Sequence, residues 1–261
     1  MAGQFYPDGP GELEGVVRGF LQPDVAREKA IAVIAPHAGY EYSGAVAGTV
    51  YSAVKIPDDV VLIGPNHTGL GTRASIMTGG AWEIPTGRVD INGELAGRLV
   101  ESTKLFSPDT SAHLREHSLE VQLPFIHHIN GNARFVPITV MRADYNDCVE
   151  MGGSIARAVL EYGKEVLLIV SSDMNHYESD KRTREKDRLA IEKILSLDAK
   201  GLLDVTSSME ITMCGVLPAA IAMVAAGSLG ASTARLVKYS TSGEVSGDYA
   251  HVVGYAGIII R

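Results

Sequence analysis

Short runs of consecutive apolar residues alternate along the chain with longer segments in which apolar and polar positions are mixed. Three of these runs, at 30–35, 60–63 and 166–170, hold only Ala, Val, Ile and Leu. Apolar runs of this length are typical of strands buried on both faces of a parallel sheet. Further strands are expected at Arg73–Met77, Phe135–Val140, Ala234–Tyr239 and Val252–Ile260.

The mixed segments between these strands predict helices. The helices are expected at Gly11–Leu21, Gly44–Val54, Gly93–Glu101, Cys148–Tyr162, Lys181–Leu195 and Pro218–Gly227. Ser43 can cap the second of them, because a serine side chain accepts a free N–H of the first helical turn. Strands that alternate with helices favour an α/β fold. Since no repeat, low-complexity block or linker interrupts the pattern, residues 1–261 are interpreted as a single domain.

The charge of the chain restricts its partners. The net charge is −8 and no basic stripe appears, so nucleic acid and anionic membranes are not expected as partners. The stretch Met213–Ala234 is uncharged, but small residues dominate it. It is therefore interpreted as a buried helix rather than a membrane span, which needs about 20 strongly apolar residues.

The two cysteines and the first residues of the chain bear on its compartment. Cys148 stands among acidic residues and Cys214 in an uncharged stretch, so no disulfide framework is predicted. This fits a reducing compartment. The first residues have neither the basic nor the apolar segment of a signal peptide. We therefore expect a cytoplasmic protein.

A histidine follows each of the three apolar runs. His37 follows the first after one proline, His67 the second after Gly-Pro-Asn, and His176 the third after Ser-Ser-Asp-Met-Asn. In open α/β sheets, ligands bind in the crevice beyond the carboxyl ends of parallel strands. If the three strands are parallel and adjacent, the imidazoles and Asp173 converge there. One such histidine alone is more often a turn or core residue, but three in equivalent positions favour a functional cleft.

Cys214 adds a thiol near the start of the last predicted helix, where the helix dipole favours the thiolate. The alternative is a buried, inert cysteine. With His37 and His67, Cys214 predicts a metal site suited to zinc, copper or ferrous iron. Asp173 could replace Cys214 as third ligand, or orient a ligand imidazole. His176 is then expected as general acid or base, because imidazole titrates near neutrality.

A competing motif lies in the middle of the chain. The string HLREH at 113–117 matches the H-x-x-E-H pattern of inverzincin metallopeptidases. On a helix, His113 and His117 would share one face with Glu116 beside them and could hold zinc. Short patterns of this kind also arise by chance. The alternative is that Glu116 and His117 line or support the main cleft.

Two further features concern ligands other than metals. Tyr40 and Tyr42, close behind His37, could line a pocket for an aromatic or peptidic ligand. Such tyrosines are more often packing residues with a hydrogen-bonded hydroxyl. The glycines near the second apolar run form no dinucleotide-binding string, and no Walker pattern is present. No nucleotide cofactor is expected.

Several strings together resemble the Memo family, which in bacteria and archaea is also called AmmeMemoRadiSam system protein B. They run in order from the first residues to beyond Cys214, so the resemblance covers nearly the whole chain. The strings are AGQFYP at 2–7, APHAGYEYSG at 35–44, GPNH at 64–67, EHSLE at 116–120, SSDMNHY at 171–177 and MCG at 213–215.

The resemblance implies the fold of class III extradiol dioxygenases, with one α/β domain around a mixed, largely parallel sheet flanked by helices. It also implies metal ligands at His37, His67 and Cys214, with Asp173 and His176 beside them as candidate catalytic groups. Two histidines and a carboxylate hold the iron of the dioxygenases, whereas a thiolate takes the third position here. Ring cleavage therefore does not follow from the fold. Residues expected to contact substrate or support the ligands are Tyr42, Glu116 and His117.

The expected function is that of a metal-binding protein with redox or dioxygenase-like chemistry. Iron(II) is the preferred ion, with copper or zinc as alternatives, and a small molecule or peptide would occupy the cleft. A second interpretation is a binding module that grips a peptide or partner there without catalysis. Eukaryotic relatives are linked to cell motility, phosphotyrosine-peptide binding and iron or copper redox chemistry. The prokaryotic family name implies association with a radical S-adenosylmethionine protein and an AMMECR-like protein.

Overall fold

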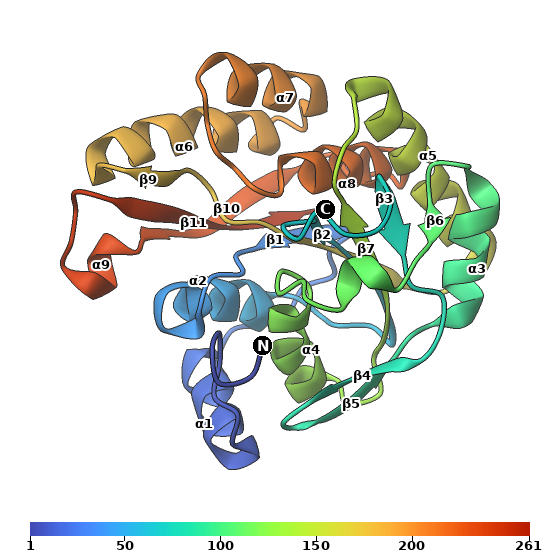
Figure 1. Cartoon of the computed structure of the whole chain (residues 1–261), viewed down its shortest axis with the longest axis horizontal. Helices are drawn as coiled ribbons and strands as arrows, with labels where there is room; N and C mark the ends of the chain where they lie inside the picture. The colour runs from blue at the N-terminus through green and yellow to red at the C-terminus, as the bar shows by residue number, and fades with distance from the viewer.

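A nine-stranded mixed sheet runs through the centre of the computed structural model, which describes residues 1–261 (Figure 1). The strand order is β10-β11-β1-β8-β2-β7-β3-β6, and β9 pairs with β11 beside this path. The strands are β1 Ala32–Ala35, β2 Asp59–Pro65, β3 Ala74–Ile76, β4 Ala81–Ile84, β5 Gly87–Asp90, β6 Ser107–Pro108, β7 Arg134–Val140, β8 Val166–Ser171, β9 His176–Glu178, β10 Ala234–Thr241 and β11 Val252–Ile260. The hairpin of β4 and β5 is a separate two-stranded sheet.

Helices cover both faces of the central sheet (Figure 1). The helices are α1 Pro10–Phe20, α2 Tyr40–Ala53, α3 Gly93–Ser102, α4 Leu123–Ile129, α5 Tyr145–Tyr162, α6 Asp180–Leu195, α7 Ala199–Ser208, α8 Val216–Ser228 and α9 Gly243–Ser246, with 3₁₀ turns η1 Ser111–His113 and η2 Glu120–Gln122. One layer contains α1, α2 and α4, and the other contains α3 and α5 to α8. Val33 packs with the first layer and Ile34 with the second. Because both faces are covered, the strands are apolar without interruption, and each such buried side chain contributes about 1.5–3 kcal/mol.

Three parallel strands lie side by side in the middle of the sheet. Strand β8 pairs with β1 on one side and with β2 on the other, parallel in both cases. The last residues of β1 and β8, Ala35 and Ser171, are direct neighbours in the register. The condition for convergence, that these strands be parallel and adjacent, is therefore met. The segments that leave these strands carry His37, His67 and Asp173 to one edge of the sheet.

The start of the second helix differs from the prediction. Helix α2 begins at Tyr40, with Gly39 as its N-cap. Ser43 already lies in the first turn, because its N–H donates to the Gly39 carbonyl. Its hydroxyl donates to the Ala38 carbonyl at 2.8 Å. The prediction of Ser43 as the N-cap was wrong, because the helix begins one turn earlier than the apolar pattern indicated.

Some elements were not predicted at all. They are the helices α4, α7 and α9, the hairpin of β4 and β5, and the short strands β6 and β9. Pro124 lies in the first turn of α4, where a proline is tolerated because its missing N–H would have no partner. The uncharged stretch Met213–Ala234 contains α8, which is buried against the sheet. None of the helices has the length and apolar character that crossing a bilayer requires.

Candidate metal centre

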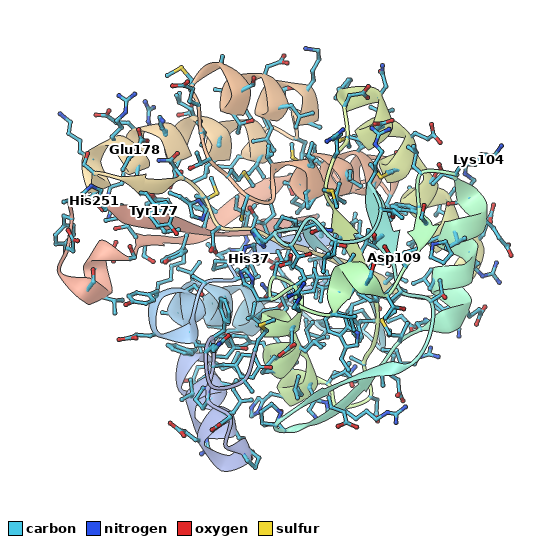
Figure 2. All side chains as sticks on the ribbon, in the orientation of Figure 1. His37, Lys104, Asp109, Tyr177, Glu178 and His251 are labelled. Carbon is cyan, nitrogen blue, oxygen red and sulfur yellow. The ribbon has the colours of Figure 1, made fainter.

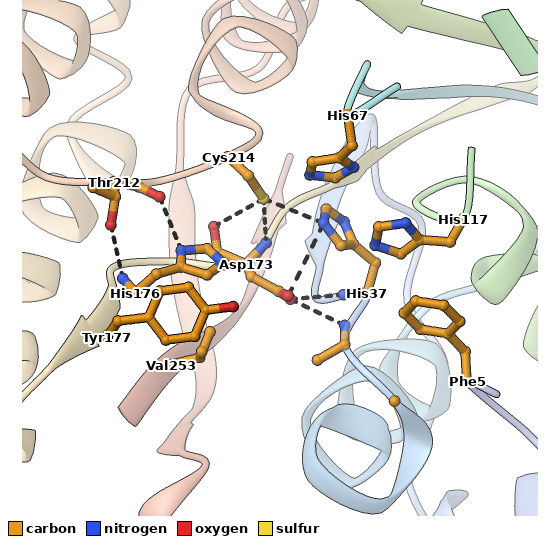
Figure 3. A pocket seen from close by; sticks show the side chains of 12 residues that line it. Phe5, His37, His67, His117, Asp173, His176, Tyr177, Thr212, Cys214 and Val253 are labelled. Atoms are coloured by element: carbon orange, nitrogen blue, oxygen red, sulfur yellow. Dashed lines mark hydrogen bonds and ion pairs between the residues drawn. The ribbon is translucent and has the colours of Figure 1, made fainter. Parts of the chain in front are cut away.

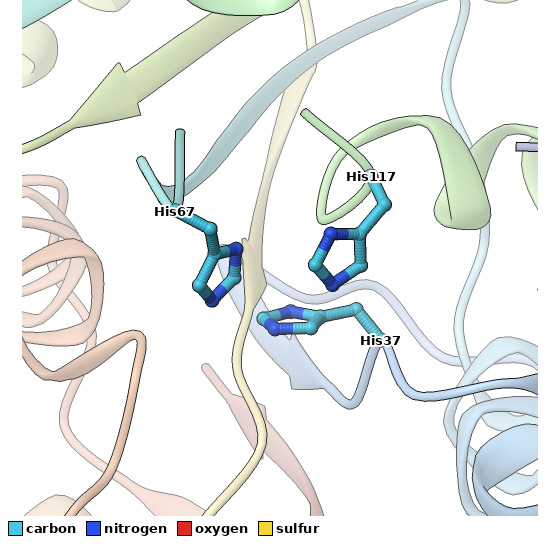
Figure 4. Close-up of side chains that lie close together, drawn as sticks. All are labelled: His37, His67 and His117. Atoms are coloured by element: carbon cyan, nitrogen blue, oxygen red, sulfur yellow. The ribbon is translucent and has the colours of Figure 1, made fainter. Parts of the chain in front are cut away.

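Three imidazoles meet at the edge of the sheet where the parallel strands end. His37 follows β1, His67 follows β2, and His117 lies between η1 and η2. Each offers one ligand nitrogen, and these atoms all lie within 4.8 Å of one another (Figure 4). The His67 and His117 rings are stacked, while His37 meets both edge-on. Such a cluster could hold a metal ion.

The hydrogen bonds of His37 decide which of its nitrogens faces the cluster. Ser171 Oγ donates to the Ser118 carbonyl at 2.5 Å, so its proton is already used. It therefore accepts from His37 Nδ1 at 3.0 Å, and also from Gln122 Nε2 at 2.8 Å. With the proton on Nδ1, the lone pair of His37 Nε2 is free. Burial, followed by the neighbouring imidazoles, lowers the pKa of His37 well below its usual value, so the ring is neutral.

A buried carboxylate orients His67 in the same way. Glu116 Oε1 lies 2.9 Å from His67 Nδ1, and Oε2 accepts from the His67 N–H at 2.6 Å. The Ser118 N–H donates to Oε1 at 3.0 Å. Burial acts to raise the pKa of Glu116, but these hydrogen bonds outweigh it and lower the pKa to about 2. The ionised carboxylate keeps the proton on Nδ1 and leaves His67 Nε2 as the ligand atom, as in many metal sites.

Cys214 lies beside this cluster, just before α8. Its Sγ is 3.2 Å from His37 Nε2 and accepts from the Asp173 N–H at 3.3 Å (Figure 3). Burial, with the nearby Asp173 charge, raises the pKa of the thiol far above its usual value. This differs from the expected lowering by the helix dipole, because desolvation of a thiolate outweighs the dipole of one helix. A bound cation would reverse this balance.

Asp173 is buried next to His37. Its Oδ1 accepts from the N–H groups of His37 at 2.8 Å and Ala38 at 3.3 Å. Its Oδ2 is 4.0 Å from His37 Nε2. Burial raises the pKa of Asp173, and the two backbone donors oppose that rise. The carboxyl is thus fixed by the backbone of one candidate ligand while its second oxygen points toward the cluster.

His176 stands across the pocket from the imidazole cluster. Its Nδ1 lies 2.9 Å from the Thr212 carbonyl, and its N–H donates to Thr212 Oγ1 at 2.8 Å. Because a carbonyl only accepts, Nδ1 carries a proton. Asn175 fixes this arrangement, since its Oδ1 accepts from the Thr212 N–H at 3.0 Å and its backbone N–H donates to Asp187. The loop before Cys214 is therefore tied to the loop after β8.

A pocket of about 660 Å³ opens onto these groups (Figure 3). Its lining is Phe5, His37, Ala38, Gly39, His67, His117, Asp173, His176, Tyr177, Thr212, Cys214 and Val253. No lysine or arginine is among them. The pocket offers unprotonated ring nitrogens, a carboxyl group and a thiol, which suit a cation better than an anion.

The structure separates the candidate residues into those at the pocket and those away from it. Tyr42 is on α2, half-exposed, and does not line the pocket. His113 is buried beside Trp82, and neither of its ring nitrogens has a hydrogen-bond partner. No α-helix spans 113–117, because η1 ends at His113. The single-face arrangement of the peptidase interpretation is therefore not formed, and Glu116 is engaged with His67 instead.

Several pocket residues had not been singled out. Phe5 stacks on His117 with ring centroids 4.3 Å apart. Tyr177 and Thr212 line the pocket opposite the imidazole cluster. The strings around Phe5 and Tyr177 were among those that resemble the family, but nothing in the sequence indicated that their side chains face a common cavity.

The donor set fits a first-row metal ion. Metal–nitrogen and metal–sulfur bonds of about 2.0 and 2.3 Å place two ligand atoms of one ion about 3–4 Å apart. The 3.2 Å between His37 Nε2 and Cys214 Sγ agrees with this spacing. The lone pairs of His37 and His67 are freed by bonds on the opposite nitrogen. Imidazole and thiolate together favour zinc, copper or iron over magnesium or calcium.

Known proteins resemble this chain over its full length. The family model described as Memo-like protein matches residues 1–259. A MEMO1 family protein of Methanopyrus kandleri is 42% identical over 275 residues, covering 100% of this chain and 97% of the relative. A MEMO1 family protein of Aquifex aeolicus is 41% identical over 263 residues, covering 99% and 97%. The crystal structure of an uncharacterized protein from Escherichia coli K12 has a TM-score of 0.60 at 13% identity, covering 88% of this chain and 100% of that one. That structural likeness supports the α/β fold.

Proposed function

This chain belongs to the Memo family, and from that premise we propose that it binds a divalent metal ion in the imidazole cluster and uses it for redox chemistry. The observation that carries the proposal is the direction of the imidazoles. Both His37 and His67 hold their Nδ1 protons on buried acceptors, which leaves Nε2 free at a common point. A cation bound at that point would take up both lone pairs.

The proposed ligands are His37, His67 and Cys214, with His117 next to them on the Phe5 side of the pocket. The contact between Cys214 Sγ and His37 Nε2 supports the sulfur as third ligand. The grouping of His117 with the other two imidazoles makes it the competing third ligand. Iron(II) is the proposed ion, and copper and zinc suit the same donors. When bound, the ion supplies Lewis-acid and electron-transfer chemistry to a small molecule or peptide in the pocket.

The surrounding residues would manage protons and orientation. His176 lines the pocket with its Nδ1 on the Thr212 carbonyl, which leaves Nε2 as the nitrogen that would exchange a proton with a bound ligand. The pKa of Asp173 is raised by burial, so its carboxyl can hold a proton and return it. Phe5 and Val253 keep the lining partly apolar. Acid and base are thereby separated across one cavity.

Metal analysis tests this proposal. The protein is purified without oxygen, loaded with ferrous iron, and its metal is measured by elemental analysis beside His37→Ala and His67→Ala. We expect stoichiometric iron in the native chain and loss of it in both variants. Oxygen consumption by the loaded protein with catechols, thiols and peptides then tests the redox step. Absence of metal would refute the site, and bound metal without turnover would refute the redox part.

A non-catalytic binding module is the second candidate, and the open pocket favours it. Tyr177, 74% exposed at this pocket, presents a surface of the kind that partners use. His67→Ala separates the two candidates, since a module would keep its partner after losing its metal. Family membership also supports association with a radical S-adenosylmethionine protein and an AMMECR-like protein. Co-elution of the purified proteins tests that association, and separate elution would contradict it.

A further inference from the structure

Tyr177 has a backbone conformation that aromatic residues rarely adopt. Its φ is +61°, in the left-handed region, where the Cβ crowds the following carbonyl. Residues held in such conformations cluster at functional sites, because the surroundings must enforce them. Glycine would fit this position without steric cost. The local backbone conformation therefore does not explain why this position holds a tyrosine.

The residues on both sides of Tyr177 are fixed, so the conformation is enforced. The His176 N–H is bound to Thr212 Oγ1. Glu178 pairs with Val252 of β11 and accepts from Lys186 Nζ at 2.8 Å. The register of the pair of β9 and β11 shifts at this point. The backbone turns at Tyr177 between two anchored neighbours, and the turn directs the side chain.

The ring is directed into the metal pocket. Tyr177 lines the cavity, and its ring centroid is 5.7 Å from that of His176. In Figure 3 its hydroxyl points toward the Asp173 carboxyl, and the ring stands beside Val253. Figure 2 shows Tyr177 near one side of the molecule and His37 nearer its middle. Although it is 74% exposed, the ring thus faces the space that a metal-bound ligand would fill.

The charge of the pocket restricts what could lie against this ring. None of the lining residues is a lysine or arginine. Asp173 presents a carboxyl group to the cavity, and His176 presents an imidazole. An uncharged ring would meet the face of Tyr177 and the side chain of Val253.

We propose that Tyr177 is a ligand-contacting residue that packs against a flat, uncharged face of a small molecule whose chelating atoms reach the metal. This inference rests on the proposed metal site. It adds a specificity residue at the far end of the pocket. The energetic contribution is that of an aromatic contact, which corresponds to roughly a threefold to tenfold change in affinity.

Two hydroxamates test the proposal on the zinc-loaded protein. Acetohydroxamate and benzohydroxamate chelate alike, but only the second carries a ring, so the ratio of their dissociation constants isolates the ring contact. In Tyr177→Ala we expect the affinity for benzohydroxamate to fall by roughly threefold to tenfold, and the affinity for acetohydroxamate to stay unchanged. Tyr177→Phe should keep the ratio. Tyr249→Ala is the matched control, because Tyr249 is exposed but does not line the pocket.

Tyr177→Gly distinguishes a ligand contact from a structural role. Glycine relieves the backbone, so the melting temperature should not fall, while the benzohydroxamate preference should be lost. If the benzohydroxamate preference of the Tyr177 variants instead rose and fell with their melting temperature, the inference would be overturned. An unchanged preference in Tyr177→Ala would overturn the inference and leave the metal site intact. If acetohydroxamate itself does not bind, the metal site fails and the inference with it.

Discussion

His67 Nδ1 lies 2.9 Å from Glu116 Oε1, and the Glu116 side chain is completely buried. The same carboxylate accepts from two backbone N–H groups, those of His67 and Ser118. Three donors therefore converge on two oxygens of one ionised group. This arrangement fixes both the loop after β2 and the tautomer of one candidate ligand.

Glu116→Gln should weaken metal binding by roughly tenfold, the lower end of the effect that such supporting carboxylates have. An amide has one acceptor oxygen in place of two, so at least one of the three donors loses its partner. Affinity is measured by competition with a chelator of known strength. Glu150→Gln is the control, because Glu150 lies on α5 and contacts Thr103. Equal affinities for the two variants would show that Glu116 does not orient His67.

Cys214→Ser and His117→Ala should affect the metal differently. In the cobalt-loaded protein, a thiolate ligand gives a near-ultraviolet charge-transfer band, which should vanish in Cys214→Ser and persist in His117→Ala. The serine variant should also lose more affinity, because a neutral hydroxyl is a poor ligand for such ions. A band that survives in Cys214→Ser would assign the third position to His117 instead.

Much of this site follows from the order of residues along the chain. The apolar runs before His37, His67 and Asp173 predict buried strands, and parallel pairing of β1, β8 and β2 brings their exits together. The sequence is sufficient to place these three residues, because the topology of the sheet fixes where the chain leaves each strand. The chemistry of the residues at such an exit can be interpreted directly.

The remainder depends on packing that no local pattern reveals. His117 reaches the cluster from a segment between two 3₁₀ turns, and the contacts of Glu116 with His67 hold that segment in place. The thiol pKa of Cys214 was misjudged for a related reason. Its position before α8 was predicted, but the burial that governs its ionisation was not. Burial is a property of the whole fold.

Asp187 should make the stability of the fold depend on pH. It is fully buried on α6, where burial raises its pKa to about 7, against hydrogen bonding from Tyr239. Arg184 and Glu178 are the nearby charges. A raised pKa means that the folded chain keeps a proton which the unfolded chain releases near pH 4. The contribution of this proton to the free energy of unfolding is fully present below about pH 4 and is lost as the pH rises through 7.

Comparison with Asp187→Asn isolates this contribution. Between pH 5 and 7 the native chain should lose about 2 kcal/mol of unfolding free energy more than the variant does. The measurement is urea unfolding at both pH values. Asp204→Asn serves as the control, since Asp204 is an exposed residue of α7 paired with Lys200. The same pH slope in Asp187→Asn and the native chain would contradict the prediction.

Two adjacent glycines of α5 should respond oppositely to alanine. A Cβ on Gly152 would lie 2.6 Å from the Ile221 carbonyl oxygen and 2.7 Å from Val224 Cβ, both on α8. The helices would have to move apart, so Gly152→Ala should destabilise the fold by roughly 1–3 kcal/mol. A Cβ on Gly153 would meet nothing within 4 Å. Gly153→Ala should instead stabilise it by roughly 0.5–1 kcal/mol, since alanine is the better helix former.

Urea unfolding of both variants measures these free energies, and metal affinity provides a second readout. Helix α5 packs against α8 and α3, away from the segments that carry the imidazoles. Gly153→Ala should therefore leave metal affinity unchanged. Because the same substitution is made at neighbouring positions, helix propensity alone would move both stabilities upward. A parallel gain in the two variants would show that α5 and α8 do not approach as closely as Gly152 requires.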